Sequence, residues 1–134
     1  MIMALATMFI SYANAQNAEH KVFCELLGTQ KFMSTKITVE VDFGQGGAMG
    51  SWFSSKNALV DEITGKKITF NSMIDAMNYM AAFGWEFEQA YVITIGSGTS
   101  AQNVYHWLLS KDVKDQEELK DGITTKKDYK ETAQ

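Results

Sequence analysis

The chain has 134 residues, and 46% of them are hydrophobic, so its length and composition predict one folded domain and exclude general disorder. Its formal net charge is −4 and no long basic run occurs, which excludes nucleic acid as an expected partner. Proline is absent, so no proline-rich linker divides the chain.

The first fifteen residues, "MIMALATMFISYANA", have the composition of a secretory signal peptide. Their apolar run, Ile2 to Ile10, has the length of a signal-peptide h-region, and Ala13-Asn14-Ala15 supplies a small-x-small cleavage pattern. No lysine or arginine precedes the run, and it is shorter than the roughly 20 residues of a membrane span. We therefore expect residues 1–15 to be removed and the mature chain to be periplasmic or secreted, with no stable membrane span. The alternative is an apolar first strand or helix of the domain.

Cys24 is the one cysteine of the chain, so no internal disulfide forms and the core must supply the stability. The preceding residues, Lys21-Val22-Phe23, lack the small side chains of a lipoprotein cleavage site, so we predict no lipid anchor. We interpret Cys24 as a small buried hydrophobe. A reactive thiol and half of an intermolecular disulfide are the alternatives.

Two strands are predicted in residues 20–27 and 37–43. In "HKVFCELL" a valine, the cysteine and a leucine share one side of the strand. In "ITVEVDF" apolar and polar residues alternate strictly, which is typical of a half-buried antiparallel strand. The intervening "GTQKFMSTK" is long enough for a hairpin connection.

A glycine-rich stretch, "GQGGAMGSWFSSKN", follows the second strand. A phosphate-binding loop needs a Lys-Ser/Thr ending and a following helix, and neither is present, so we predict a flexible connection that carries Trp52 and Phe53. Further along, Thr64-Gly65 is a turn signal between two β-prone pieces and predicts a small hairpin.

A helix is predicted between residues 71 and 84. Asn71 or Ser72 can cap its start, and Gly84 stands where a left-handed residue ends a helix. An apolar stripe at three- and four-residue spacing comprises Met73, Ile74, Met77, Met80 and Ala81. Such a stripe indicates a core face rather than a metal site or a flexible binding groove.

The next two segments predict strands, and the last segment predicts a tail. In "FGWEFEQAYVITI", residues 83–95, the aromatic and isoleucine side chains share one parity, and we predict that the helix buries them. "VYHWLL", residues 104–109, is apolar on both faces, which is typical of a central strand or one covered on its outer face. The charged residues beyond it predict one or two helical turns up to Gly122 and a frayed remainder.

The segment from residue 68 to 111 resembles a group of small uncharacterised proteins, many of them from Bacteroidetes. The resemblance lies in a helix of the type "FNSMIDAMNYMAAFGWEF", a strand like "QAYVIT" and a last strand like "NVYHWLLSK". It implies the same strand–strand–helix–strand–strand order and an exported bacterial setting. It implies no activity and no catalytic residue.

The sequence contains no nucleotide-binding fingerprint, no nucleophile elbow and no paired-cysteine motif. A metal site made of His20, Cys24 and His106 is conceivable, but these residues lack the spacing of known ligand sets. We therefore predict that the protein is not an enzyme and holds no metal or cofactor.

The strand parities place four carboxylates on the sheet face away from the helix. They are Glu40, Asp42, Glu86 and Glu88, and Glu25 joins them if its strand lies in the same sheet. A solvated, charged face that prevents aggregation is the plain interpretation. The alternatives are weak contact with a divalent cation or a glycan, and acid–base catalysis of the kind that paired carboxylates perform in glycoside hydrolysis.

Three aromatic side chains form the other candidate surface, for a ligand or a partner. Trp52 lies in the glycine-rich loop, and Tyr105 and Trp107 offer a stacking platform if their side of the last strand faces outward. The competing use of such an apolar face is a protein interface.

These patterns predict an α+β fold: an antiparallel sheet of about four strands in ββαββ order, with one helix packed on one face. We assign residues 1–15 to a signal peptide, 16–111 to a single domain and 112–134 to a charged, partly disordered tail. The leading functional hypothesis is a non-catalytic exported protein that forms a homo-oligomer or binds an envelope protein. A glycan- or amphiphile-binding module is the second hypothesis, and an enzyme that uses the outer carboxylates is the third.

Overall fold

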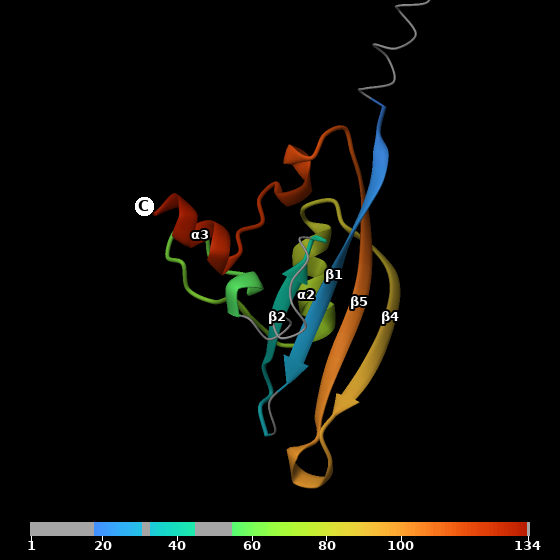
Figure 1. Ribbon diagram of the computed structural model, residues 1–134, viewed down its shortest axis with the longest axis vertical. Helices are drawn as coiled ribbons and strands as arrows, with labels where there is room; N and C mark the ends of the chain where they lie inside the picture. The colour runs from blue at the N-terminus through green and yellow to red at the C-terminus, as the bar shows by residue number, and fades with distance from the viewer. Residues whose placement is uncertain (1–17, 31–32, 45–54, 134) are drawn as a thin grey trace, which may run out of the picture.

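The computed structural model describes residues 18–30, 33–44 and 55–133. Within these residues the architecture is α+β, with a five-stranded antiparallel sheet and two α-helices (Figure 1). The strands are β1 (His20–Gln30), β2 (Ile37–Asp42), β3 (Thr69–Phe70), β4 (Glu86–Ile95) and β5 (Gln102–Val113). The helices are α2 (Met73–Ala81) and α3 (Lys126–Thr132), with the 3-10 helices η2 (Ser55–Asn57), η3 (Gly98–Ser100) and η4 (Glu117–Lys120).

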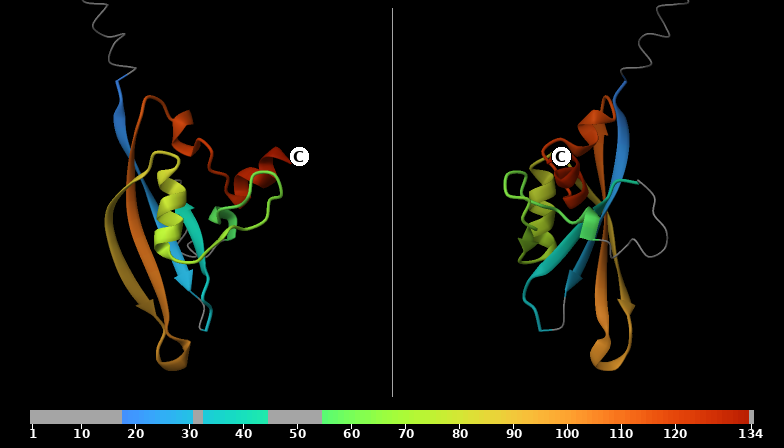
Figure 2. Two further views of the ribbon diagram at one scale, coloured as in Figure 1. Left: turned by 180° about the vertical axis from the view of Figure 1, so that it is seen from behind. Right: turned by 60° about the vertical axis from the view of Figure 1, so that its left-hand side comes forward.

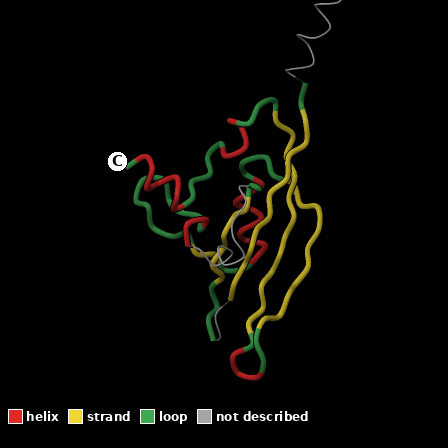
Figure 3. The backbone as a smooth tube through the Cα atoms, viewed as in Figure 1, coloured by secondary structure: helices red, strands yellow, loops and turns green. Residues whose placement is uncertain are grey.

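The strands lie in the order β3-β2-β1-β5-β4, and each neighbouring pair runs antiparallel. β5 is therefore a central strand, between β1 and β4, as the apolar pattern on both of its faces predicted. The short strand β3 adds to the four predicted ones, and it pairs with β2 just before α2 begins. Figure 3 shows the long strands side by side, with the β4–β5 hairpin reaching past the end of β1.

α2 covers one face of the sheet, where the core lies (Figure 2, left). Ser72 begins the helix as predicted, because its Oγ accepts a hydrogen bond from the N–H of Asp75 at 3.1 Å. Gly84 follows the end of the helix with φ at +88°, a conformation that favours glycine. The buried residues of α2 are Met73, Ala76 and Met80. The methionine face is thus core as predicted, whereas Ile74 and Ala81, which the predicted stripe also included, are exposed.

The hydrophobic core draws on strands, helix and connections alike. Its buried members are Cys24, Leu26, Ile37, Val39, Val41, Phe43, Leu59, Phe70, Met73, Ala76, Met80, Trp85, Leu109 and Ile123. The alternation in β2 is confirmed, because its apolar residues are buried and its last residue, Asp42, is exposed. The core is therefore assembled from side chains that lie up to a hundred residues apart in the sequence.

β4 contradicts the prediction that its aromatic row is buried under the helix. Trp85, which directly precedes the strand, lies in the core with 1% exposure. Every residue of β4 is exposed, including Phe87 and Tyr91. The physical reason is position: β4 forms the margin of the sheet, beyond the strands that α2 covers (Figures 1 and 2).

A β-bulge is the second reason why the alternation of residues in β4 did not predict which of its side chains share a face. Phe87 stands opposite Leu109, and Gln89 stands opposite the very next residue of β5, Leu108. One extra residue in β4 therefore reverses the alternation of faces from that point on. As a result, Phe87 shares the face of the core residue Leu109, while Tyr91 points to the opposite face of the sheet.

The predicted hairpin at residues 64–65 is present. The N–H of Asp61 donates to the carbonyl of Lys66 at 2.9 Å, and Val60 forms a bridge with Lys67. Gly65 has φ at +64° in this turn. The sequence signal was sufficient here because a turn of this kind depends on local geometry alone.

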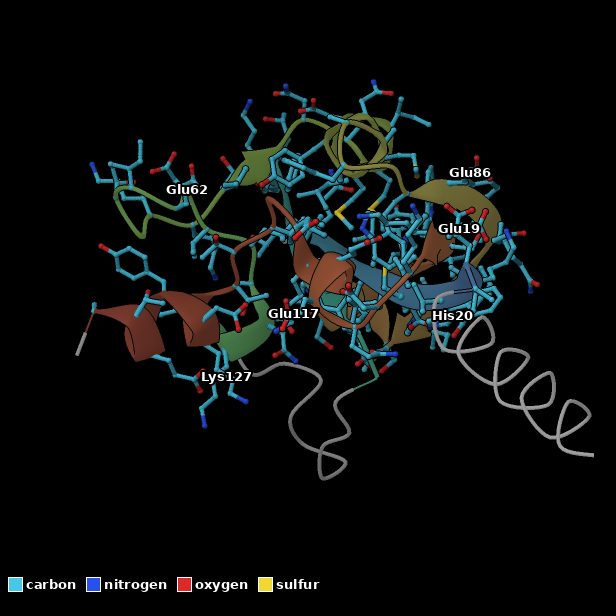
Figure 4. The ribbon with its side chains drawn as sticks, turned by 90° about the horizontal axis from the view of Figure 1, so that it is seen from above. Glu19, His20, Glu62, Glu86, Glu117 and Lys127 are labelled. Carbon is cyan, nitrogen blue, oxygen red and sulfur yellow. The ribbon has the colours of Figure 1, made fainter. Side chains whose placement is uncertain are left out.

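The chain after β5 is more ordered than the expected frayed tail. Ile123 is 4% exposed in the core, and Thr125 forms a bridge with Leu59. Thr125 also begins α3 with a capping box that it shares with Asp128. Figure 4 shows Lys127 of α3 and Glu62 of the hairpin on the side of the molecule away from Glu86 in β4. The segment therefore folds back onto the core, and α3 lies on the side of the molecule away from β4.

Within the described ranges, none of the helices has the length and apolar character needed to cross a membrane.

Candidate functional site

The face of the sheet opposite α2 is here called the outer face (Figure 2, right). It carries the polar side chains of interest. Residues opposite one another in an antiparallel pair share a face, so the strand register assigns its members. They include Phe23, Glu25, Leu27, Glu40, Asp42, Glu86, Tyr91, Ile93, Ile95, Val104, His106, Leu108 and Ser110, and Glu88 reaches the same face through its contact with Ser110. This face combines carboxylates from three strands with apolar side chains from β1, β4 and β5.

Glu25, His106 and Tyr91 form a connected cluster on this face. The Nδ1 of His106 lies 2.6 Å from Oε1 of Glu25, and the hydroxyl of Tyr91 donates to Oε2 of the same carboxylate at 3.4 Å. The rings of Tyr91 and His106 stack with centroids 4.6 Å apart and planes inclined by 6°. Three adjacent strands, β1, β5 and β4, are thereby linked by side chains.

The cluster has the side chains that acid–base chemistry uses, but its imidazole is not accessible to a substrate. His106 is only 2% exposed, and Tyr91 covers one face of its ring. Loss of hydration, followed by the charge and the hydrogen bond of Glu25, raises the pKa of Tyr91, so its phenol stays protonated and donates. We therefore interpret the cluster as a tie between strands. The sequence signal was faint, because residues 25, 91 and 106 meet only through strand pairing.

Glu88 and Ser110 form a second polar contact. Glu88 is the residue skipped at the bulge, and its carboxylate accepts a hydrogen bond from the hydroxyl of Ser110. Ser110 is fully buried, so this bond satisfies a hydroxyl that would otherwise be costly to bury. The bulge thus allows Glu88 to reach across to β5.

The predicted outer carboxylates all lie on this face, but they do not form one site. Glu40 and Asp42 belong to β2, whereas Glu86 and Glu88 belong to β4, and both β1 and β5 lie between. Three strand spacings of about 4.8 Å separate β2 from β4 by about 14 Å, more than the separation that paired carboxylates need in glycoside hydrolysis. Catalysis by a pair drawn from both strands is therefore not supported by the geometry.

Glu40 is the most perturbed of these carboxyl groups. It is half-buried, and burial raises its pKa to about 7, against an opposing effect of the Lys67 charge. Asp42 instead accepts a hydrogen bond from the N–H of Gly44 at 2.7 Å. Glu40 therefore changes charge near neutral pH.

The two aromatic candidates of β5 do not stand beside the outer carboxylates. Tyr105 and Trp107 lie on the helix side of the sheet and pack, half-buried, against the core. Trp107 meets Phe87 edge to face, with ring centroids 5.1 Å apart. Trp52 lies outside the described residues. The sequence could not choose the outward face of β5, because both faces of that strand are apolar.

Cys24 is buried at 2% exposure on the helix side, as the sequence analysis predicted. Burial, with smaller contributions from the charges of Asp42 and Glu25, raises the pKa of its thiol far above the usual range. Such a thiol is unreactive. His106 lies on the opposite face, and in the part of the chain that the structure describes no three metal-ligating side chains come together.

The free edge of β4 is the most unusual surface of the molecule. Exposed fractions are 45% for Tyr91, 54% for Val92, 44% for Ile93 and 45% for Ile95. The strand pairs with β5 on one side, and no described strand pairs with its other side. Sequence reasoning missed this edge, although the absence of any charge from Gln89 to Ile95 was a visible signal.

Comparisons with protein-family models, with curated proteins and with solved structures found no match for this chain.

Proposed function

We propose that the protein is a non-enzymatic binding protein that pairs β4 with a strand of a protein partner. The observation that carries this proposal is an edge strand of ten residues, all exposed, with large apolar side chains on both faces. An edge strand presents a row of backbone N–H and C=O groups to any extended chain that approaches it. Apolar side chains on both faces then add buried area to the backbone hydrogen bonds.

The protection that natural edge strands usually carry is present on only part of β4. Glu86, Glu88 and the bulge protect its first residues, because charge and irregularity discourage pairing. From Gln89 to Ile95 the strand has no charge, no proline and no covering described element. An uncovered apolar edge of this length favours use as an interface.

The proposal includes export to the periplasm or the exterior and kinship with the Bacteroidetes-type group. Its support is the apolar run of residues 2–10 followed by Ala13-Asn14-Ala15, and the helix-to-strand segment around Gly84. Export predicts a protein in the envelope or culture fluid whose N-terminus, determined by mass spectrometry, is Gln16. Recovery of the protein in the cytoplasm with Met1 retained contradicts this part.

Photo-crosslinking in the producing cell tests the binding function. A photoreactive residue at Val92, on β4, should give a protein adduct of defined mass. The matched control carries the same residue at Ile63, which is 81% exposed on the distant hairpin, and should give none. Equal yields at the two positions, or no adduct at Val92, would contradict strand pairing at β4.

A second candidate function is contact with a small amphiphile. The half-exposed ring pair of Phe87 and Trp107 on the helix side of the sheet favours it. A sugar-headed detergent below its micelle concentration should release heat in calorimetry with the native chain, and Phe87→Ala should abolish the signal. The Ile63→Ala variant is the control, and an unchanged signal with Phe87→Ala excludes this site.

A further inference from the structure

We infer that the partner paired with β4 is a second copy of the chain, joined antiparallel about a two-fold axis at Val92. The inference rests on the proposed function and specifies the partner. It follows from two features of β4, the position of the bulge and the symmetry of a sheet edge, and the placement of charge is compatible with it.

The bulge defines which part of β4 is regular. Pairing with β5 is interrupted between Phe87 and Gln89 and then runs without a break from Gln89 to Ile95. A regular edge accepts a new strand, whereas a bulge disrupts the ladder. The regular segment has seven residues, and Val92 is its midpoint.

Symmetry restricts the register of two identical edges. A two-fold axis perpendicular to the sheet keeps each face on the same side, so residues of the same parity must stand opposite one another. Centring the axis on Val92 satisfies this condition and uses the whole regular segment. Tyr91 of each copy then stands opposite Ile93 of the other, which forms an aromatic–β-branched pair on the outer face.

Charge placement is compatible with this arrangement. With the axis at Val92, Glu88 falls opposite Gly96 and Glu86 opposite Gly98 of the other copy, so no like charges meet. Parallel pairing through the same free edge would instead turn the helix side of one copy to the outer face of the other, so the two sheets would not share a core side. The pairs inside the segment, including Ala90 with Thr94, are all uncharged.

The inferred dimer has one continuous sheet of ten strands. On the helix side the two Val92 side chains meet at the axis, and on the outer face two Tyr91–Ile93 pairs flank it. Three of the five exposed large apolar side chains of β4 are thereby covered at once. Because the interface is isologous, it closes after two copies and leaves no edge for further growth at β4.

Sedimentation of the purified native chain over a wide concentration range, with reductant present, tests the dimer. We expect a monomer–dimer equilibrium, and we expect Val92→Lys to raise the dimer dissociation constant about tenfold or more, because two lysines would face each other at the axis. Val92 is exposed, so the monomer should keep its thermal midpoint. The Ile63→Lys control should dimerise like the native chain.

Cysteine crosslinking tests the register. Opposed residues have Cα atoms about 4.5–5.5 Å apart, within the range of a disulfide, so Val92→Cys should link to itself under mild oxidation. Thr94→Cys should not link to itself. Each Thr94 would stand opposite Ala90 of the other copy, so the two residues at position 94 would lie four residues, or about 13 Å, apart along the strands. A mixture of Ala90→Cys and Thr94→Cys should form the mixed disulfide. Cys24 is buried and does not interfere.

A chain that is monomeric at every concentration overturns the inference, as does a dimer that is insensitive to Val92→Lys. A disulfide at Thr94→Cys without one at Val92→Cys overturns the register. If photo-crosslinking at Val92 captures a different protein while the purified chain is monomeric, the strand-pairing function stands and the second copy is excluded. If neither experiment yields an adduct or a dimer, both proposals fail.

Discussion

At the scale of single residues, the outer face is organised by polar side chains that satisfy one another. Glu25 accepts from Tyr91 and holds His106, and Glu88 accepts from the buried Ser110. Buried polar groups of this kind are expensive to leave unpaired, so each of these contacts fixes the position of one strand relative to its neighbour.

The Glu25 carboxylate should therefore contribute measurably to stability. Glu25→Gln should lower the free energy of unfolding by about 1–3 kcal/mol, because it weakens the contact to a nearly inaccessible imidazole. Tyr91→Phe should cost less, since its hydrogen bond is 3.4 Å long and lies at the surface. Urea unfolding measures both, and a Glu25→Gln variant as stable as the native chain would show that the contact is dispensable.

Glu40 should make stability depend on pH. Its pKa is about 7 in the folded chain and near the ordinary value of 4.5 when unfolded, so the folded state binds more protons between these values. Stability should thus fall as pH rises through this window, by on the order of 1 kcal/mol after allowance for solvent screening of a half-exposed group. Glu40→Gln should lose this slope in urea unfolding at pH 5 and pH 8. Parallel pH profiles of the two proteins would exclude Glu40 as the cause.

At the scale of elements, small structural features decide what each strand and helix exposes. One bulged residue reverses the faces of β4, and one turn positions the hairpin against α3. At that turn, a Cβ on Gly65 would collide with the ring of Tyr129. Tyr129 therefore packs directly over a glycine, and α3 depends on the hairpin for its position.

Substitution of Gly65 should test this packing. Gly65→Ala places an alanine where the backbone is left-handed, at φ +64°, and it also displaces the Tyr129 ring. The loss in free energy of unfolding should therefore exceed the backbone effect alone by at least about 1 kcal/mol. Gly98→Ala is the matched control, because Gly98 has φ at +59° and a Cβ added there would meet nothing within 4 Å. Thermal unfolding compares them, and equal losses would mean that the ring moves away freely.

At the scale of the whole molecule, the chain after β5 is a structural part of the domain. Ile123 is a buried member of the core cluster that also contains Trp85 and Phe43, and Lys120 pairs with Asp128 at 3.0 Å. Partial burial alone would raise the pKa of Asp128, but hydrogen bonds from Thr125 and Lys120 lower it instead. The C-terminal segment is thus held against the domain by the buried side chain of Ile123 and by the Lys120–Asp128 ion pair.

Removal of the buried Ile123 side chain should destabilise the whole domain rather than only the tail. Ile123→Ala should lower the free energy of unfolding by about 2–4 kcal/mol in a single cooperative transition. Ile63→Ala, at an 81% exposed position, should change it little. Circular dichroism during urea unfolding measures both, and an Ile123→Ala loss no larger than the control would mean that the segment is not part of the core.

The sequence by itself determined the local structure. Strict alternation identified β2, Ser72 and Gly84 bounded α2, and the methionine spacing identified its buried face, because these patterns depend on neighbours within one or two turns. The two-sided apolar character of β5 likewise predicted a central strand.

Only the tertiary structure decided the surfaces that matter for function. The pairing of β1 with β5 brings Glu25 to His106 across 81 residues, and the bulge and the edge position turn the aromatic row of β4 outward. Such features depend on which strand lies beside which, and parity within one strand contains no information on its neighbours or on an extra residue in the ladder. For that reason the apolar surface available to a partner lies on β4, where the sequence predicted a core.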